Sequence, residues 1–257
     1  MTSFFRLEDG LVLPEPLAAG PWSDEMLNGS NAFALAAWAV EREHGEEGLL
    51  CARLVVDLLR PVPMAPLRVE TRTVRAGGRL RAVDVELHAE GTLAARGTAL
   101  LLRPGEPAPG GPWRQPEWEL PHPESLPRLE NEQTRNVQLD VRPELEGVFF
   151  PPGRRRFWAR QQIELVAGEP WTPFLRAAAA ADLANPTANR GETMRYINAD
   201  VTLQIVRPPT GEWIGLETLD HLASDGIAFG AASLYDLDGR FGWCSVAALA
   251  TAATQVI

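Results

Sequence analysis

The chain has 257 residues, of which 45% are hydrophobic and 23% charged, as is typical of a globular protein with one or two domains. The net charge of −10 argues against a general affinity for nucleic acids or anionic membranes. All 24 basic residues are arginines, which excludes a lysine nucleophile and a Walker A loop.

The N-terminus shows no basic region followed by an apolar stretch, and no apolar run approaches the roughly 18 residues of a membrane span. We therefore expect a cytoplasmic protein without a membrane span. Two cysteines, Cys51 and Cys244, cannot form a disulfide framework and have no metal-ligand spacing. We expect no metal and no cofactor, and we interpret both thiols as buried and inert.

In the first half, a strand near residues 4–13 precedes a strongly apolar helix over about 30–42. Ser30 or Asn31 is the expected N-cap, and Gly45 is suited to the C-terminal cap. Four strands are then predicted, near 49–60, 67–75, 79–89 and 92–102, with tight turns at Gly77-Gly78 and Glu90-Gly91. Because the helix is apolar nearly all round, it must be covered on most sides.

A proline-rich stretch then separates the two halves. Eight of the 22 prolines lie between Pro104 and Pro127, and proline at this density blocks regular ladders and helices. We interpret residues 104–134 as a surface linker that Trp113 and Trp118 pin to the body.

The second half repeats the pattern of the first. A strand near 154–165 is followed by a helix near 173–184 and by strands near 196–207, 213–222, 226–236 and 241–252, with a hairpin at Asp238-Gly239. At a constant offset of 147 residues, the segment from Ala52 to Pro61 resembles that from Ala199 to Pro208, and Glu70-Thr71 meets Glu217-Thr218. Several matches at one offset predict an internal duplication.

A helix followed by an antiparallel meander, occurring twice, resembles the double hotdog fold. The stretches Ala180-Ala181-Asp182-Leu183 and Ile197-Asn198-Ala199-Asp200, with Asp238-Gly239, are similar to the acyl-CoA thioesterase II family. The resemblance implies an α+β double hotdog with two helix-wrapped antiparallel sheets. It divides the chain into an N-terminal hotdog domain over 1–103, the linker over 104–134, and a C-terminal hotdog domain over 135–257.

The resemblance also implies an active site. In that family, an Asp at the end of the second helix positions the attacking water, and this Asp falls on Asp182. A Thr, Ser or Asn at the start of the next strand falls on Asn198. A Gln on the last strand should fall at Val246 or Ala247, neither of which can orient water, and the nearest polar side chains are those of Ser245 and Cys244.

Further site elements come from loops and strand ends. Asn28, Gly29 and Ser30 precede the first helix, where a helix N-terminus can bind a carbonyl or phosphate, and hotdog proteins often place this region opposite the partner unit's acid. We predict that these residues bind substrate together with Ser245. Asp200 follows Asn198 by two residues, and regular alternation would place both on one face of the strand.

The predicted reaction is hydrolysis of an acyl-CoA thioester to free acid and CoA, with a carboxylate as general base. The partners implied are an acyl-CoA substrate and further copies of the chain in a homo-oligomer. Two alternatives stay open. One is a non-catalytic acyl-CoA or lipid-binding hotdog protein, favoured by the missing Gln. The other is an enoyl-thioester hydratase or dehydratase, which would need a histidine beside the acid.

Overall fold

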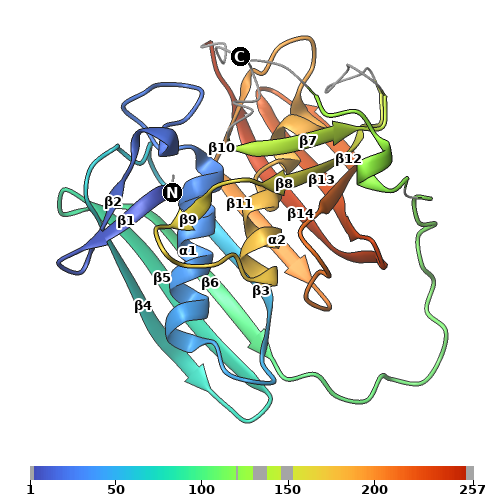
Figure 1. Ribbon diagram of the computed structural model, residues 1–257, viewed down its shortest axis with the longest axis horizontal. Coiled ribbons are helices and arrows are strands. Elements are labelled where there is room, and N and C mark those ends of the chain that lie inside the picture. The colour runs from blue at the N-terminus through green and yellow to red at the C-terminus, as the bar shows by residue number, and fades with distance from the viewer. Residues whose placement is uncertain (1–2, 120, 130–137, 146–152, 253–257) are drawn as a thin grey trace.

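The computed structural model describes residues 3–119, 121–129, 138–145 and 153–252 (Figure 1). Its strands form one mixed sheet of 14 strands, in which the two antiparallel sheets predicted for the two units are continuous with each other. The sheets are joined because β3 (Leu50–Leu58) and β11 (Asp200–Ile205), the first long strands of the two meanders, pair with each other. The sheet is mixed because β1 (Ser3–Glu8) and β9 (Glu164–Val166) pair in parallel.

The strands alternate with two α-helices and short helical turns along the chain. The remaining elements are β2 (Leu11–Pro14), η1 (Pro16–Ala18), α1 (Gly29–His44), β4 (Leu67–Ala76), β5 (Leu80–Ala89), β6 (Thr92–Leu102), η2 (Pro123–Ser125), β7 (Leu139–Pro143), β8 (Arg156–Gln161), α2 (Pro173–Ala181), the π-helical turn η4 (Asn185–Asn189), β10 (Tyr196–Asn198), β12 (Ile214–Ser224), β13 (Ile227–Asp236) and β14 (Gly239–Ala250).

The two halves have the same strand order. Outward from the centre of the sheet, the first unit runs β3, β6, β5, β4 and the second runs β11, β14, β13, β12. The 147-residue offset carries β5, Leu80–Ala89, onto β13, Ile227–Asp236, without a shift. The predicted helix-plus-meander unit therefore occurs twice with one topology.

The pairing of β3 with β11 defines the centre of this arrangement. Val55 pairs with Thr202, and on either side Leu54 pairs with Leu203 and Val56 with Val201. Val55 and Thr202 are themselves 147 positions apart. An approximate twofold axis through this residue pair would exchange Val55 with Thr202. It therefore relates residues of the two units that are 147 positions apart, which is the offset found in the sequence.

Both helices lie on the inner face of the sheet and contact each other (Figure 1). Ten consecutive residues of α1, from Asn31 to Val40, are buried, as the apolar pattern of that segment predicts. The sheet covers α1 with β3 to β6, and covers α2 with β8, β11, β12 and β14. The N-cap of α1 is Asn28 rather than Ser30 or Asn31, because the Asn28 side chain accepts a hydrogen bond from the Ser30 N–H.

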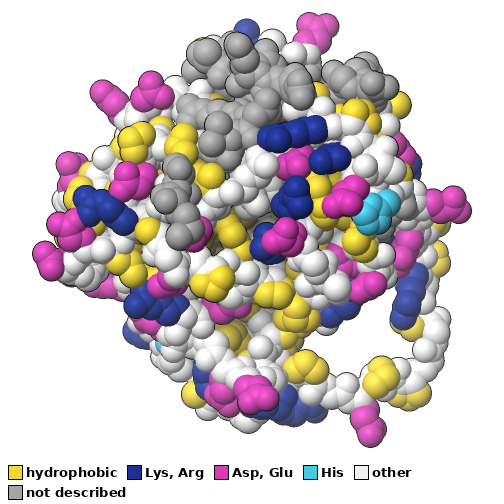
Figure 2. Space-filling model, viewed as in Figure 1, with side chains coloured by type: hydrophobic (Ala, Val, Ile, Leu, Met, Phe, Trp, Pro, Cys, Tyr) yellow, Lys and Arg dark blue, Asp and Glu magenta, His cyan; other side chains and the backbone are white. Residues whose placement is uncertain are grey.

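The linker leaves the body after β6 and forms an arch before it returns to the second unit (Figures 1 and 2). Trp118 pins its returning end, since it is 5% exposed and packs against Trp158 and Tyr235. Trp113 is 84% exposed, so the prediction that it also anchors the linker was wrong. The predicted linker end at residue 134 lies outside the described residues.

Within the described part of the chain, neither helix has the length and apolar character needed to cross a membrane. Arginine and acidic side chains are interspersed over the face drawn in Figure 2.

Candidate active site

An acid, an amide and a helix N-terminus meet where the two units face each other. Asp182 is the C-cap residue of α2, and its Oδ1 accepts a hydrogen bond of 2.5 Å from Asn198 Nδ2. The backbone N–H of Ser30, in the first turn of α1, is shared between Asn28 Oδ1 and the Asp182 carboxylate. Gly29 permits this approach, because a Cβ there would lie only 3.0 Å from Asp182 Oδ1.

The electrostatics of Asp182 suit a general base. Burial of the carboxylate raises its pKa from 3.8 to about 6, while the hydrogen bonds from Asn198 and Ser30 act in the opposite direction. An acid with this pKa is still ionised at neutral pH but is more basic than an ordinary aspartate. At neutral pH, Asp182 is therefore present as the carboxylate that can accept a proton, and its pKa is close enough to that pH for efficient proton transfer.

Asn198 reaches Asp182 because the strand that carries it is irregular. Asn198 pairs with Ala248 on β14, whereas Thr202 pairs with Ser245, so four steps on one strand match three on the other. One extra residue at the junction of β10 and β11 reverses the alternation. Asn198 consequently faces inward while Asp200 faces outward, and the expectation that they share a face was wrong.

The oxygen of the Asn198 amide is left without a partner. Its Nδ2 donates to Asp182, but its Oδ1 is buried with no hydrogen-bond partner among the described residues. A buried polar atom of this kind is costly unless water or a ligand satisfies it. The Asp182 carboxylate and the Asn198 Oδ1 thus offer two neighbouring acceptors.

On β14, only one of the two positions expected for a Gln faces the site. Cys244, Val246 and Ala248 are each at most 1% exposed and line the inner face. Val246 lies between Cys244 and Ala248 on this face. Burial raises the pKa of the Cys244 thiol, and the nearby Asp182 charge raises it further. Ala248 is the strand partner of Asn198, so both neighbours of Val246 adjoin the site. Ala247 is exposed on the outer face.

The same alternation corrects the assignment of Ser245. Because it lies between the inward-facing Cys244 and Val246, its side chain points to the opposite face of the sheet. The structure brings together four of the predicted site residues, Asp182, Asn198, Gly29 and Ser30, and Asn28 caps the same helix end. Ser245 lies outside this group.

The corresponding place in the first unit is built differently. Glu41 of α1 accepts a hydrogen bond of 2.5 Å from Thr172 Oγ1, and Thr172 is the N-cap of α2. Burial raises the Glu41 pKa. Cys51, 147 positions before Asn198, is 8% exposed and offers no amide. Glu41 was not predicted from the sequence, although an acid near the end of an apolar helix was a usable signal.

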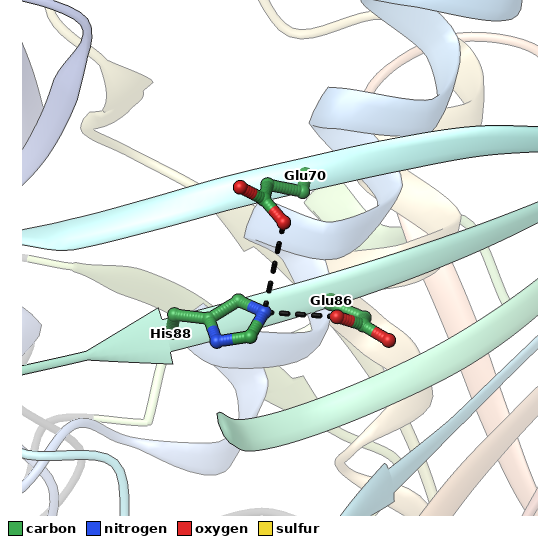
Figure 3. A group of neighbouring side chains, drawn as sticks. All are labelled: Glu70, Glu86 and His88. Atoms are coloured by element: carbon green, nitrogen blue, oxygen red, sulfur yellow. Dashed lines mark hydrogen bonds and ion pairs between the residues drawn. The ribbon is translucent and has the colours of Figure 1, made fainter. Parts of the chain in front are cut away.

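Among the described residues, the four histidine side chains make their polar contacts with groups other than Asp182. His88 Nε2 lies near Glu86 and Glu70 on the outer face of the first unit (Figure 3). The ring nitrogens of the other three histidines contact polar groups of Thr71, Glu124 and Asn189. Among the described residues, these contacts supply no acid–histidine pair at Asp182 of the kind that a hydratase would need.

Two family models together match most of the chain. The model of the acyl-CoA thioesterase N-terminal domain matches residues 18–102, and that of the acyl-CoA thioesterase C-terminal domain matches residues 106–245. No curated protein sequence matches the chain significantly.

Solved structures share the fold at low sequence identity. An acyl-CoA thioesterase II, TesB2, from Mycobacterium marinum has a TM-score of 0.66 at 16% identity, covering 96% of this chain and 93% of its own. A tesB protein from Mycobacterium avium subs paratuberculosis has a TM-score of 0.68 at 17% identity, with coverages of 96% and 95%. A hot dog fold protein of unknown function from Alicyclobacillus acidocaldarius has a TM-score of 0.74 at 15% identity, with coverages of 97% and 96%.

Proposed function

Because the chain belongs to the acyl-CoA thioesterase family, we propose that it hydrolyses acyl-CoA thioesters at one site, with Asp182 as general base and Asn198 as its partner. The observation that carries this assignment is the Asp182 carboxylate, held between the Asn198 amide and the Ser30 N–H with its pKa raised to about 6. The chemistry requires neither a metal nor a covalent nucleophile.

In the proposed reaction, water donates one hydrogen bond to the Asp182 carboxylate and the other to Asn198 Oδ1. This leaves an oxygen lone pair free to attack the thioester carbon. Asp182 takes the proton as the C–O bond forms, and the thioester oxygen becomes negative. The thiolate of CoA then leaves as the carbonyl re-forms, and the proton held by Asp182 neutralises it.

We assign the first turn of α1 to the thioester carbonyl. Amides at a helix N-terminus favour negative charge, and Gly29 lets this turn lie directly against the Asp182 carboxylate. Asn28 supports this turn by capping it. The proposed roles of Asn28, Gly29 and Ser30 in substrate binding therefore follow from their position beside the base.

We further infer that the two units arose by duplication, forming a double hotdog. The common strand order and the 147-residue spacing of the central Val55–Thr202 pair support this origin. The domain limits at residues 103 and 135, the cytoplasmic location and the homo-oligomer stay predictions.

The test is release of free thiol from a panel of acyl-CoA esters with acyl chains from C2 to C16. We expect turnover with at least one member, and the preferred chain length identifies the substrate class. Binding of every ester without thiol release would instead favour a non-catalytic acyl-CoA-binding protein, the alternative that Val246 in place of the family Gln supports.

A further inference from the structure

We propose that Asp200 is a positioning residue that holds Asn198 in the active site from the opposite face of the sheet. This inference rests on the proposed function, because it concerns the partner of the proposed base. Asp200 lies on the outer face, so it does not touch the substrate or the reacting atoms.

One extra residue lies between β10 and β11. The chain advances four residues from Asn198 to Thr202 while β14 advances three from Ser245 to Ala248. Without this irregularity, the Asn198 side chain would point away from α2. A β-bulge interrupts the regular ladder and leaves backbone groups unpaired unless other contacts satisfy them.

Asp200 supplies those contacts. Its Oδ1 accepts a hydrogen bond of 2.5 Å from the backbone N–H of Ala247, and its Oδ2 accepts one of 3.2 Å from Thr202 Oγ1. The Ala247 carbonyl in turn accepts from the Ala199 N–H at 2.8 Å. The Asp200 carboxylate therefore replaces a ladder bond at the point where the register changes.

The position of Asp200 has an electrostatic cost. Asp200 pairs directly with Asp57 across the joined strands, and like charges in that position repel. Burial and Asp57 both raise the Asp200 pKa, while the Ala247 N–H and Thr202 lower it. The bond to Ala247 explains why an acid occupies this position despite the repulsion.

The experiment compares Asp200→Ala, Asp200→Asn, Asn198→Ala and the double variant Asn198→Ala/Asp200→Ala by kcat and KM for thiol release. Asp200→Asn keeps an acceptor for the Ala247 N–H, so we expect nearly full activity. Asp200→Ala loses it, and kcat should fall about 10-fold with little change in KM. The double variant should be no slower than Asn198→Ala alone, because both changes remove one interaction.

The outcomes separate this inference from the function itself. If Asn198→Ala is fully active, the site assignment fails. If Asn198→Ala is slow but Asp200→Ala is not, only the positioning role is overturned. Additive losses in the double variant, or equal losses in Asp200→Asn and Asp200→Ala, also contradict it. Thr202→Ala is the matched control, since it removes the other contact of Asp200 and should leave kcat within about twofold.

Discussion

The two units share one strand order but differ where each helix meets the other unit. In the second unit, α2 ends at Ala181, and Asp182 and Asn198 form an acid–amide pair beside the N-terminus of α1. In the first, α1 continues to His44, Glu41 is bonded to Thr172, and a buried Cys51 replaces the amide. The fold thus offers two related places, and among the described residues only the second combines a base with a free acceptor for water.

The largest effect should follow from Asp182→Asn. This change nearly preserves the shape of the side chain but removes its ability to take a proton. We expect thiol release to fall about 100-fold or more, the scale of a positioned base. Glu41→Gln is the matched control in the other unit and should keep wild-type turnover. Equal losses in the two variants would show that the units are not specialised.

A smaller loss should follow from Asn198→Ala. Without the amide, Asp182 loses a donor and the water loses an acceptor, so turnover should fall about 10-fold or more. Cys51→Ala tests the corresponding position of the first unit and should not change the rate. The measurement is the same thiol release at saturating acyl-CoA, and an unaffected Asn198→Ala would remove the amide from the mechanism.

Two neighbouring positions on β14, Val246 and Ala247, test the site through an expected gain of activity rather than a loss. Val246→Gln places an amide on the inner face beside the site, where it can help hold the water, and should raise hydrolysis several-fold, the worth of about one hydrogen bond. Ala247→Gln places the same amide on the exposed outer face and should have no effect on the rate. A gain from Ala247→Gln alone would contradict the assignment of Val246 to the inner face and Ala247 to the outer face of β14.

The smallest effect concerns stability. Burial raises the Asp182 pKa to about 6, so the ionised form is disfavoured in the folded state. The contribution of Asp182 to stability is therefore full below the unfolded pKa near 4 and is lost as pH rises through about 6. Asp182→Asn should raise Tm by a few degrees at pH 8 and by less at pH 4. Thermal unfolding at both pH values checks the difference.

Much of this arrangement could be predicted from the sequence. The 147-residue offset and the two helices follow from residue patterns in the sequence, whereas Asp182 was identified through the resemblance to the thioesterase family. The inward turn of Asn198 could not be predicted, because one extra residue near Ala199 reverses alternation without a distinctive residue type. Ser245 was misplaced because the alternation of β14 is clear only once its buried face is known. Glu41 and Thr172 are 131 positions apart, and only the packing of the helices brings them together.

The most direct measurement of the central claim is the pH dependence of kcat/KM for thiol release by the wild-type protein and by Asp182→Asn. The wild-type value should fall as pH decreases through about 6, because protonated Asp182 cannot accept a proton from water. The residual activity of Asp182→Asn should lack this ionisation. A wild-type profile that is flat through this range, or an ionisation near pH 6 that persists in Asp182→Asn, would contradict the assignment of Asp182 as the base.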